Sequence, residues 1–447
     1  MTNTSNHSML DETHDPLLQS WVEGANDRVT DFPIQNLPFG VFRTAAAHTP
    51  RVGIAIGDHI LDCAAAVRVG LFDALPDAGR DALGATSLNP LMALGRDGAR
   101  AVRHLVSRLL RTSGDEAGRA QPLRAQILVP MPDATMLLPA QIGDYTDFYA
   151  SVHHATNIGV MLRPDQPLMP NYKWIPIGYH GRASSVVLSG TAVRRPAGQL
   201  RPDPAVDPIV APTRSLDYEL ELGAFVCGEN ATGQPVPLER AESRLFGICL
   251  LNDWSARDMQ GWEYQPLGPF LAKSFATSVS PWVVTLDALA PYRCESYVRP
   301  EGDPAPLPYL SNAHDAAQGA IDIRLEVWLQ SAAMRASGTP AVQLCGADFR
   351  TMYWTFAQML THHASNGCNL RPGDLLGSGT VSGPGATERG SMMELTLRGK
   401  TPVTLPSGET RAFLMDGDVV EFRGWCGRDG AVRIGFGECR GEVISAE

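Results

Sequence analysis

The sequence predicts a β-rich protein, mainly β with some α, that is divided into two domains. Its 447 residues exceed what one hydrophobic core usually organises. Short apolar runs bounded by Gly and Pro recur along the second half, as in 216–226, 245–253 and 417–426. Prolines interrupt the stretch 127–140, so we place the boundary near residue 138. The expected domains are 1–138, with a polar N-terminal arm, and 139–447.

Individual elements follow from local patterns. Residues 52–62 predict a hairpin around Gly57-Asp58, and apolar spacing in 99–111 predicts a helix. The composition of 111–122 predicts a loop. In the second domain one helix is expected within 348–367, ending at Asn366-Gly367. His362 and His363 are expected to complement the C-terminus of that helix.

Composition excludes several classes of protein. Thirty-seven Lys and Arg against 48 Asp and Glu leave a net charge of -11, which excludes a general nucleic-acid or anionic-membrane partner. Neither a secretory leader nor a membrane-spanning run is visible, and eight scattered cysteines without C-x-x-C indicate reduced thiols. We therefore expect a cytoplasmic protein without nucleic-acid or membrane partners. An anionic substrate must be held by local cations.

Acidic residues alternate with apolar ones along 216–222. A strand there would place Asp217, Glu219 and Glu221 on one face, with roughly 7 Å between neighbours. A solvated strand face is one interpretation, and it is the usual one for exposed acids. A cation site is the other, with Asp147 and Asp253 as further ligands. Oxygen ligands without Cys or His favour Mg, Ca or Mn over Zn.

Histidines and cations lie in neighbouring segments. His153, His154 and His180 occur in Gly-rich surroundings, where each is either a packing residue or a general base. Four cations in otherwise apolar or Gly-rich segments are either solvated or placed to hold a carboxylate and an oxyanion: Arg163, Arg182, Arg257 and Lys273. Neither a G-x-S-x-G elbow nor a Walker loop occurs, so serine-hydrolase and nucleotide chemistry are set aside.

Long segments of the sequence resemble those of the fumarylacetoacetate hydrolase family. They are IGDYTDFYASVHHATNIG, GYHGRASSVV, LDYELEL, NDWSARDMQGWEYQPLGPFLAKSF, THHASNGCNLRPGDLLGSGT and RIGFG, with FPIQNLPFGVF and VGIAIGDHILD near the N-terminus. The resemblance spans nearly the whole chain. It implies a small SH3-like barrel domain, a C-terminal mixed β-sandwich roll and a homodimer.

The resemblance also implies roles for individual residues. The metal ligands would be Asp147, Glu219, Glu221 and Asp253, with calcium or magnesium as the ion. A structural magnesium would involve Asp253, Thr277 and, through its carbonyl, Lys273. His154 would be the general base, oriented by Glu394. The oxyanion and leaving group would be stabilised by Arg257, Gln260 and Lys273, and the substrate would contact Tyr149, Arg163, Tyr179, Gln260, Tyr264 and Thr380.

The activity implied is hydrolysis of a carbon-carbon bond in 4-fumarylacetoacetate, giving fumarate and acetoacetate, the last step of tyrosine and phenylalanine breakdown. An acylpyruvate hydrolase, or another diketo-acid hydrolase, decarboxylase or hydratase of the superfamily, is the alternative. A metal-binding structural protein that has lost catalysis is the alternative from another class. Ala150 and His153 differ from the residues that the family pattern has at these positions, but neither difference removes a catalytic group.

Overall fold

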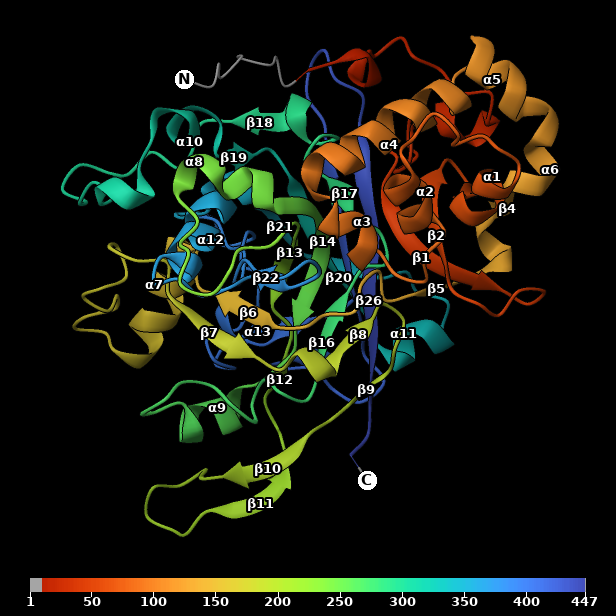
Figure 1. The fold of residues 1–447 in the computed structure, drawn as a ribbon. Coiled ribbons are helices and arrows are strands. Elements are labelled where there is room, and N and C mark those ends of the chain that lie inside the picture. The colour runs from red at the N-terminus through yellow and green to blue at the C-terminus, as the bar shows by residue number, and fades with distance from the viewer. Residues whose placement is uncertain (1–9, 447) are drawn as a thin grey trace.

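The computed structural model describes residues 10–446, so the first nine residues of the predicted polar arm lie outside the described part. The chain is strand-rich and has two regions, as the sequence predicts (Figure 1). The N-terminal region, in red and orange, packs beside the larger C-terminal region. Among the described residues, no helix is both long enough and apolar enough to cross a membrane.

The N-terminal region is built on a five-stranded antiparallel sheet of order β4-β3-β2-β1-β5, in keeping with a small SH3-like barrel. The predicted hairpin is confirmed, with β2 and β3 joined at Gly57, whose φ is 57°. Its strands are β1 Phe39–Thr44, β2 Arg51–Ile56, β3 His59–Asp62, β4 Leu128–Pro130 and β5 Ala134–Leu137.

Helices cover this sheet. The helix predicted within 99–111 is confirmed as α4, Gly95–Leu110, and its apolar face is buried. The prediction of a loop over 111–122 is wrong, because α5, Asp115–Ala120, buries Ala117 and Ala120 in the same core. The remaining helices are α1 Cys63–Arg68, α2 Asp77–Leu83, α3 Asn89–Ala93 and α6 Arg124–Ile127.

The described part of the N-terminal arm is docked on α4. The indole Nε1 of Trp21 donates to the Leu109 carbonyl at 2.9 Å, and the hydroxyl of Ser20 donates to the Leu110 carbonyl at 2.7 Å. The fully buried Arg103 of α4 donates to the carbonyl of Gln35 at 2.6 Å. These contacts hold the described part of the arm against the N-terminal core, to which it contributes Trp21, Val22, Ala25 and Ile34.

The C-terminal region contains two larger sheets. One has the order β7-β6-β22-β13-β14-β16-β8, with β17 also paired to β14, and the other has the order β21-β20-β25-β26-β9. The first comprises β6 Tyr145–Phe148, β7 Gly178–Gly181, β8 Val186–Leu188, β13 Leu220–Val226, β14 Leu245–Asp253, β16 Thr277–Val279, β17 Val284–Thr285 and β22 Leu375–Gly377. The second comprises β9 Val193–Arg194, β20 Arg324–Gln330, β21 Val342–Asp348, β25 Val419–Cys426 and β26 Ile434–Ile444.

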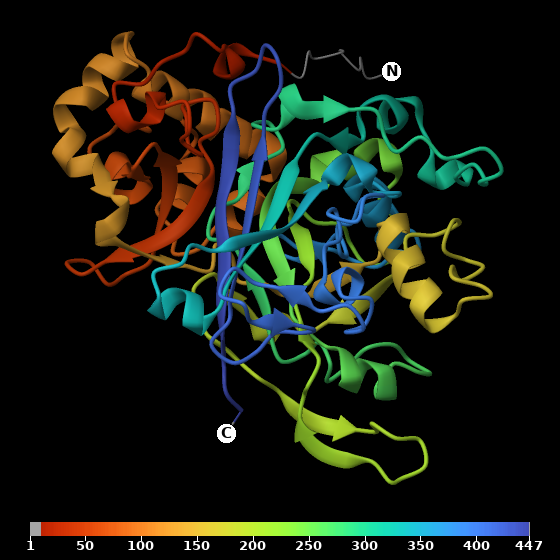
Figure 2. The same ribbon diagram turned by 180° about the vertical axis from the view of Figure 1, so that it is seen from behind.

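Strand β14 explains how the two regions join. Ile248 and Leu250 face the C-terminal core, whereas Cys249 and Leu251 face the core shared with the N-terminal region. Both faces are therefore buried, which is why this strand appears in the sequence as an unbroken apolar run. Seen from behind, the long β26 also lies against the N-terminal region (Figure 2), where the Gly435 amide donates to the Asp31 carbonyl at 2.8 Å.

Short elements complete the C-terminal region. The two-stranded pairs are β10 Ala197–Leu200 with β11 Ile209–Pro212, β12 Leu216–Asp217 with β15 Ser255–Ala256, β18 Arg293–Cys294 with β19 Ala320–Ile321, and β23 Val403–Thr404 with β24 Thr410–Arg411. The helices are α7 Val152–Leu162, α8 Leu238–Ala241, α9 Arg257–Glu263, α10 Ala313–Gln318, α11 Ala332–Ala336, α12 Phe356–Ala364 and α13 Met392–Leu395. The β10-β11 hairpin projects away from the body of the molecule (Figure 1).

One expectation about these helices needs correction, and another gains detail. The predicted helix is α12, but it begins only at Phe356, and α7 and α9 interrupt the strands as well. Burial lowers the pKa of both His362 and His363. Their ring nitrogens contact the Tyr309 hydroxyl at 2.9 Å and the Thr146 hydroxyl at 2.8 Å. The two imidazoles lie in the last turn of α12, as expected, and they also join α12 to neighbouring segments.

Candidate active site

A cavity of about 870 Å³ lies at one end of the larger sheet. Its walls come from α7 and the segment after it, from β7, from α9 with its following loop, and from residues near 380 and 393. Many side chains singled out in the sequence line it: Asp147, Tyr149, His154, Arg163, Tyr179, Glu219, Arg257, Gln260, Tyr264, Lys273 and Thr380. Glu221, Asp253, Thr277 and Glu394 lie behind this lining.

Four carboxylates converge on the cavity. Asp147 of β6, Glu219 just before β13, Glu221 of β13 and Asp253 at the end of β14 offer oxygens that all lie within 4.8 Å of one another. All four residues are buried, so a solvated face is the wrong interpretation of 216–222. The segment is also not one continuous strand, since β12 ends at Asp217 and β13 begins at Leu220.

A glycine makes room for this cluster. Gly377 lies on β22, which pairs with β6 on one side and β13 on the other. A Cβ atom at this position would lie 2.5 Å from Oδ1 of Asp147 and 3.1 Å from Oε2 of Glu221. Any larger residue would therefore push the two carboxylates out of place.

Two cations neutralise only part of the negative charge. The ammonium Nζ of Lys273 lies 2.5 Å from both Glu219 Oε2 and Asp253 Oδ2. The guanidinium of Arg257 contacts Glu219 Oε1 at 2.5 Å through Nη1 and Asp217 Oδ2 at 2.8 Å through Nε. Five buried carboxyl groups thus meet two buried cations, so carboxyl groups outnumber cations by three.

The pKa values of the clustered carboxyl groups depend on whether a cation lies beside them. Burial raises the pKa of Asp147 and Glu221, and the neighbouring carboxylates raise both further. Burial also acts on Glu219, but the charges of Lys273 and Arg257 outweigh it and hold that pKa well below its usual value. Asp147 Oδ1 and Glu221 Oε1 are buried without a hydrogen-bond partner. Unpartnered hard oxygens in a negatively charged pocket fit a divalent cation.

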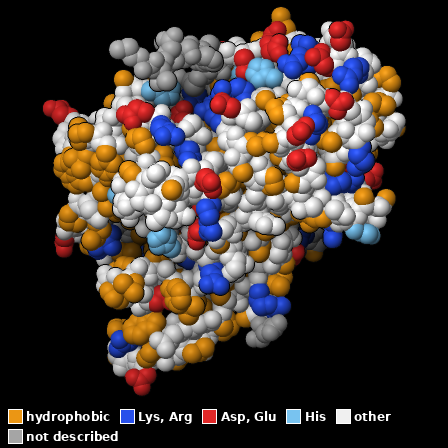
Figure 3. Space-filling view, in the orientation of Figure 1, with side chains coloured by type: hydrophobic (Ala, Val, Ile, Leu, Met, Phe, Trp, Pro, Cys, Tyr) orange, Lys and Arg blue, Asp and Glu red, His pale blue; other side chains and the backbone are white. Residues whose placement is uncertain are grey.

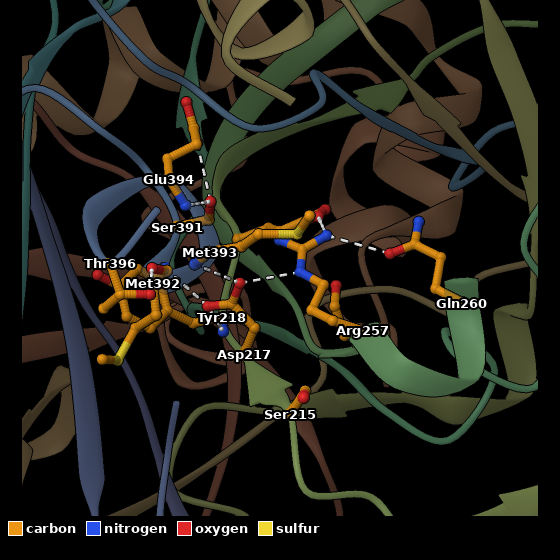
Figure 4. Close-up of polar contacts among 12 residues, drawn as sticks. Ser215, Asp217, Tyr218, Arg257, Gln260, Ser391, Met392, Met393, Glu394 and Thr396 are labelled. Carbon is orange, nitrogen blue, oxygen red and sulfur yellow. Dashed lines mark hydrogen bonds and ion pairs between the residues drawn. The ribbon is translucent and has the colours of Figure 1, made fainter. Parts of the chain in front are cut away.

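Further groups surround Asp253 and Arg257. The Tyr179 hydroxyl donates to Asp253 Oδ2 at 2.9 Å, and the Thr277 hydroxyl donates to Oδ1 at 3.2 Å. The side-chain oxygen of Gln260 accepts from Arg257 Nη1 at 3.2 Å. Figure 4 shows Arg257 between Asp217 and Gln260.

His154 and Glu394 form a buried pair next to the acidic cluster. Nδ1 of His154 lies 2.7 Å from Oε2 of Glu394, and their side chains are 4% and 0% exposed. The Ser151 side chain caps the N-terminus of α7 by accepting from the His154 amide, and α7 directs the imidazole into the cavity. Burial raises the pKa of Glu394, but His154 and the hydrogen bonds from Asn157 and Ser391 lower it more, so it stays below its usual value. Glu394 is therefore ionised and holds the imidazole in one orientation.

Several residues of this site are absent from the sequence-based set. Asn157 donates to Glu394 Oε1 at 2.9 Å, and its position three residues after His154 was the available signal. Ser382 and Ser391 donate to Glu394 Oε2 at 3.0 and 2.8 Å. Asp217 had been placed only on the face of Glu219 and Glu221. In the structure it accepts from Arg257 and from the Met392 and Met393 amides of α13 (Figure 4).

Other predicted residues lie elsewhere. Arg182 is exposed and donates to Ser184 at 2.7 Å, so it is not one of the cations of the cavity. His180 is exposed on β7, and half-buried His153 packs edge-on against Tyr297. Neither histidine lines the cavity, which leaves His154 as the imidazole there.

Known proteins resemble this chain along nearly its whole length. The family model described as fumarylacetoacetate (FAA) hydrolase C-terminal matches residues 144–444, and the one described as fumarylacetoacetase N-terminal matches residues 35–139. A Bos taurus protein named fumarylacetoacetase is 49% identical over 96% of this chain and 99% of its own length. A Caenorhabditis elegans protein of the same name is 51% identical over 94% and 97%.

One solved structure shows the same fold. It is a fumarylacetoacetate hydrolase from Exiguobacterium antarcticum, 15% identical to this chain, with a TM-score of 0.50. The match covers 92% of this chain and 99% of the other. At this identity the likeness concerns the fold alone.

Proposed function

The chain belongs to the fumarylacetoacetate hydrolase family, and on this premise we propose that it hydrolyses fumarylacetoacetate to fumarate and acetoacetate. That reaction is the last step of tyrosine and phenylalanine catabolism. The observation that carries the proposal is the His154-Glu394 pair, which lies in the same cavity as the four-carboxylate cluster. A water-activating base and a cation site are the two devices that this reaction requires.

His154 acts as the general base. Its Nδ1 atom is engaged with Glu394, so Nε2 is the atom that takes a proton from water. The hydroxide oxygen adds to the carbonyl carbon beside the double bond. The carbon-carbon bond then breaks, its electron pair leaves with the acetoacetate carbon, and that carbon is protonated. Negative charge develops on oxygen both at the tetrahedral centre and on the leaving enolate.

Buried cations face these developing charges. Arg257 and Lys273 line the cavity, and Gln260 is joined to Arg257, so the three are proposed to stabilise the oxyanion and the leaving group. Their attachment to Asp217, Glu219 and Asp253 fixes them before substrate arrives. Each donor fixed in this way typically contributes about 3 kcal/mol to stabilisation of the transition state.

A divalent cation is proposed at Asp147, Glu219, Glu221 and Asp253. When bound, it would supply an electrophile for the two carbonyl oxygens of the dioxo unit and for the enolate. The all-oxygen donor set favours calcium or magnesium. A second, structural magnesium near Asp253 and Thr277 would have to use the Lys273 carbonyl, because the ammonium is bonded to carboxylates.

The two carboxylates and the carbon chain of the substrate are proposed to contact the cavity wall. Arg163 holds one carboxylate, and the other contacts come from Tyr149, Tyr179, Gln260, Tyr264 and Thr380. The Thr380 hydroxyl and Arg163 Nε are both buried without a partner, so both have hydrogen-bonding capacity to offer.

The test is turnover by purified, metal-replete protein. We expect the dioxo absorbance of fumarylacetoacetate to fall, the activity to disappear with chelator, and added magnesium or calcium to restore it. His154→Ala should abolish turnover. Acylpyruvates are assayed alongside, and faster turnover of an acylpyruvate would assign the enzyme to the alternative activity. An unchanged absorbance would overturn the proposal.

We also propose a homodimer in the cytoplasm. All the cysteines are free thiols, as a reducing compartment requires. Large apolar side chains are exposed near the β10-β11 hairpin and after α9, with Val210 at 78%, Leu267 at 96% and Phe270 at 70%. Figure 3 shows hydrophobic side chains gathered on this lower part of the molecule. Such patches are typical of interfaces, and light scattering of the full chain tests the dimer.

A further inference from the structure

The cavity contains two kinds of cation. Four basic side chains line it: Arg163, Arg257, Lys273 and Arg398. Arg257 and Lys273 are buried and are paired with Asp217, Glu219 and Asp253. Their positive charge is therefore offset by carboxylates of the protein, and the Arg257 Nη2 atom, which has no hydrogen-bond partner among the described residues, is proposed above for the developing oxyanion and not for a substrate carboxylate.

Arg163 and Arg398 are different. Arg163 donates through Nη2 to the Pro167 carbonyl at 3.3 Å, and its Nε is buried without a partner. Within residues 10–446, no carboxylate pairs with either guanidinium, and the Arg398 side chain, which is exposed at the rim of the cavity, makes no hydrogen bond. Asp258, another acid of the lining, already accepts from the Arg214 amide at 2.8 Å. Two cations of the cavity are thus left for an anionic ligand.

The turn that places Arg398 in the cavity wall has a strained backbone. Leu397, Arg398 and Gly399 have φ values of 49°, 61° and 82°, so three consecutive residues adopt the left-handed conformation just beyond Thr396, the residue that follows α13. This conformation is uncommon for residues other than Gly, Asn and Asp. The Arg398 amide donates to the Met393 carbonyl at 2.8 Å, which ties the turn to the helix that carries Glu394. Strained non-glycine backbone concentrates at functional sites.

We propose that Arg398 binds one of the two carboxylates of the substrate, while Arg163 binds the other. This inference rests on the proposed function, since fumarylacetoacetate is a dicarboxylate. A guanidinium that forms charge-assisted hydrogen bonds selects for a carboxylate at its position. Arg398 is therefore a specificity-determining residue that favours diketo dicarboxylates over diketo monocarboxylates.

The first experiment compares two substitutions in the same turn. Arg398→Asn removes the charge and tolerates the left-handed backbone. Lys400→Asn is the matched control, because Lys400 is exposed like Arg398 but lies outside the cavity lining. We expect Arg398→Asn to raise the KM for fumarylacetoacetate about tenfold or more, with kcat changed less than about threefold. Lys400→Asn should leave both constants unchanged, and both variants should melt at the wild-type temperature.

The second experiment measures inhibition by a matched pair of analogues. Succinylacetoacetate has two carboxylates, and succinylacetone lacks the one on the acetoacetate side. We expect wild type to bind the dicarboxylate more tightly. The arginine that binds the carboxylate on the acetoacetate side should, when replaced, remove this preference. The arginine that binds the other carboxylate should, when replaced, weaken binding of both compounds. Comparing Arg398→Asn with Arg163→Gln therefore assigns each arginine to its carboxylate.

The outcomes separate this inference from the proposed function. If wild type does not hydrolyse fumarylacetoacetate, the proposed function is wrong. If wild type does hydrolyse it, but Arg398→Asn matches Lys400→Asn in KM and in both inhibition constants, the assignment of Arg398 is overturned.

Discussion

Nδ1 of His154 lies 2.7 Å from Oε2 of Glu394, on helices α7 and α13, which are 240 residues apart in the chain. Glu394 is fully surrounded by donors, since Asn157, Ser382 and Ser391 also bond to it. We therefore expect the carboxylate to orient the imidazole and to stabilise its protonated form after water has been deprotonated.

Glu394→Gln tests this role. The amide keeps the shape of the side chain but removes the charge, so the imidazolium loses its counter-ion. We expect kcat to fall by about 10²- to 10⁴-fold, with a smaller effect on KM. Asn157→Ser, which removes one donor to Glu394, should cost less. Turnover of fumarylacetoacetate at saturating metal measures both, and wild-type kcat in Glu394→Gln would contradict the assignment.

Asp287 anchors the two regions of the molecule to each other. Its carboxylate accepts from Arg96 at 3.2 Å and from Arg100 at 2.8 Å, both on α4. Burial raises its pKa, but Arg96 and Arg100 outweigh burial and hold the pKa below its usual value. A lowered carboxyl pKa stabilises the folded protein above the pKa of the unfolded chain. That stabilisation is lost as the pH falls through the folded pKa.

We therefore expect Asp287→Asn to lower the free energy of unfolding at pH 7 by about 1–3 kcal/mol. The variant should also lose less stability than wild type between neutral and acidic pH. Asp97→Asn is the matched control, because Asp97 is 96% exposed and contacts Arg100 only at 3.4 Å. Denaturant titrations at both pH values measure the effect. Equal pH dependence in Asp287→Asn and wild type would contradict it.

The segment after α7 forms a wall of the cavity although it lacks regular structure. Its Lys173 pairs with Asp303, whose side chain is only 8% exposed and also accepts from the Tyr353 hydroxyl at 3.1 Å. Arg299 packs over the Tyr353 ring at 4.3 Å and donates to the Lys173 carbonyl at 3.1 Å. The position of this wall, which includes Arg163, therefore depends on the 296–304 segment.

Asp303→Asn should loosen the wall. We expect the KM for fumarylacetoacetate to rise about three- to tenfold, because Arg163 is less well positioned, while kcat changes little. Glu301→Gln, an exposed acid in the same segment, is the matched control and should behave as wild type. Steady-state kinetics and the fluorescence of Trp174, beside Lys173, report on the change. A fall in kcat with unchanged KM would show that the wall acts in another way.

Sequence patterns predicted the parts of this fold that depend on local order. The unbroken apolar run of β14 and the Gly57 turn are both local signals, and both elements are present. Helix α7 was not predicted, although Ala155, Ile158 and Leu162 fall on one helical face, and these residues line the cavity and are not packed in the core. Helix α5 was missed because it buries only small residues, Ala117 and Ala120.

The site shows the same limit. Alternation along 216–222 suggested one acidic face, but it could not show that Asp217 turns away from Glu219 and Glu221. The partners of Asp217 are Arg257 and the amides of α13, 40 and 175 residues away along the chain. Such contacts are a product of tertiary packing, which no local period encodes. The segments that resemble the family grouped Asp147 and Asp253 with Glu219 and Glu221, which the spacing of residues alone could not do.

Gly377→Ala tests the acidic cluster without removing a carboxylate. The new methyl group would lie 2.5 Å from Asp147 Oδ1 and 3.1 Å from Glu221 Oε2, so both carboxylates must shift. We expect the affinity for magnesium or calcium, measured by titration calorimetry, to fall about 10- to 100-fold. Gly118→Ala is the control, since a Cβ there meets no atom within 4 Å and the site lies on α5. It should leave metal affinity unchanged and add slightly to helix stability. Equal metal affinity in the two variants would mean that the cation does not bind between Asp147 and Glu221.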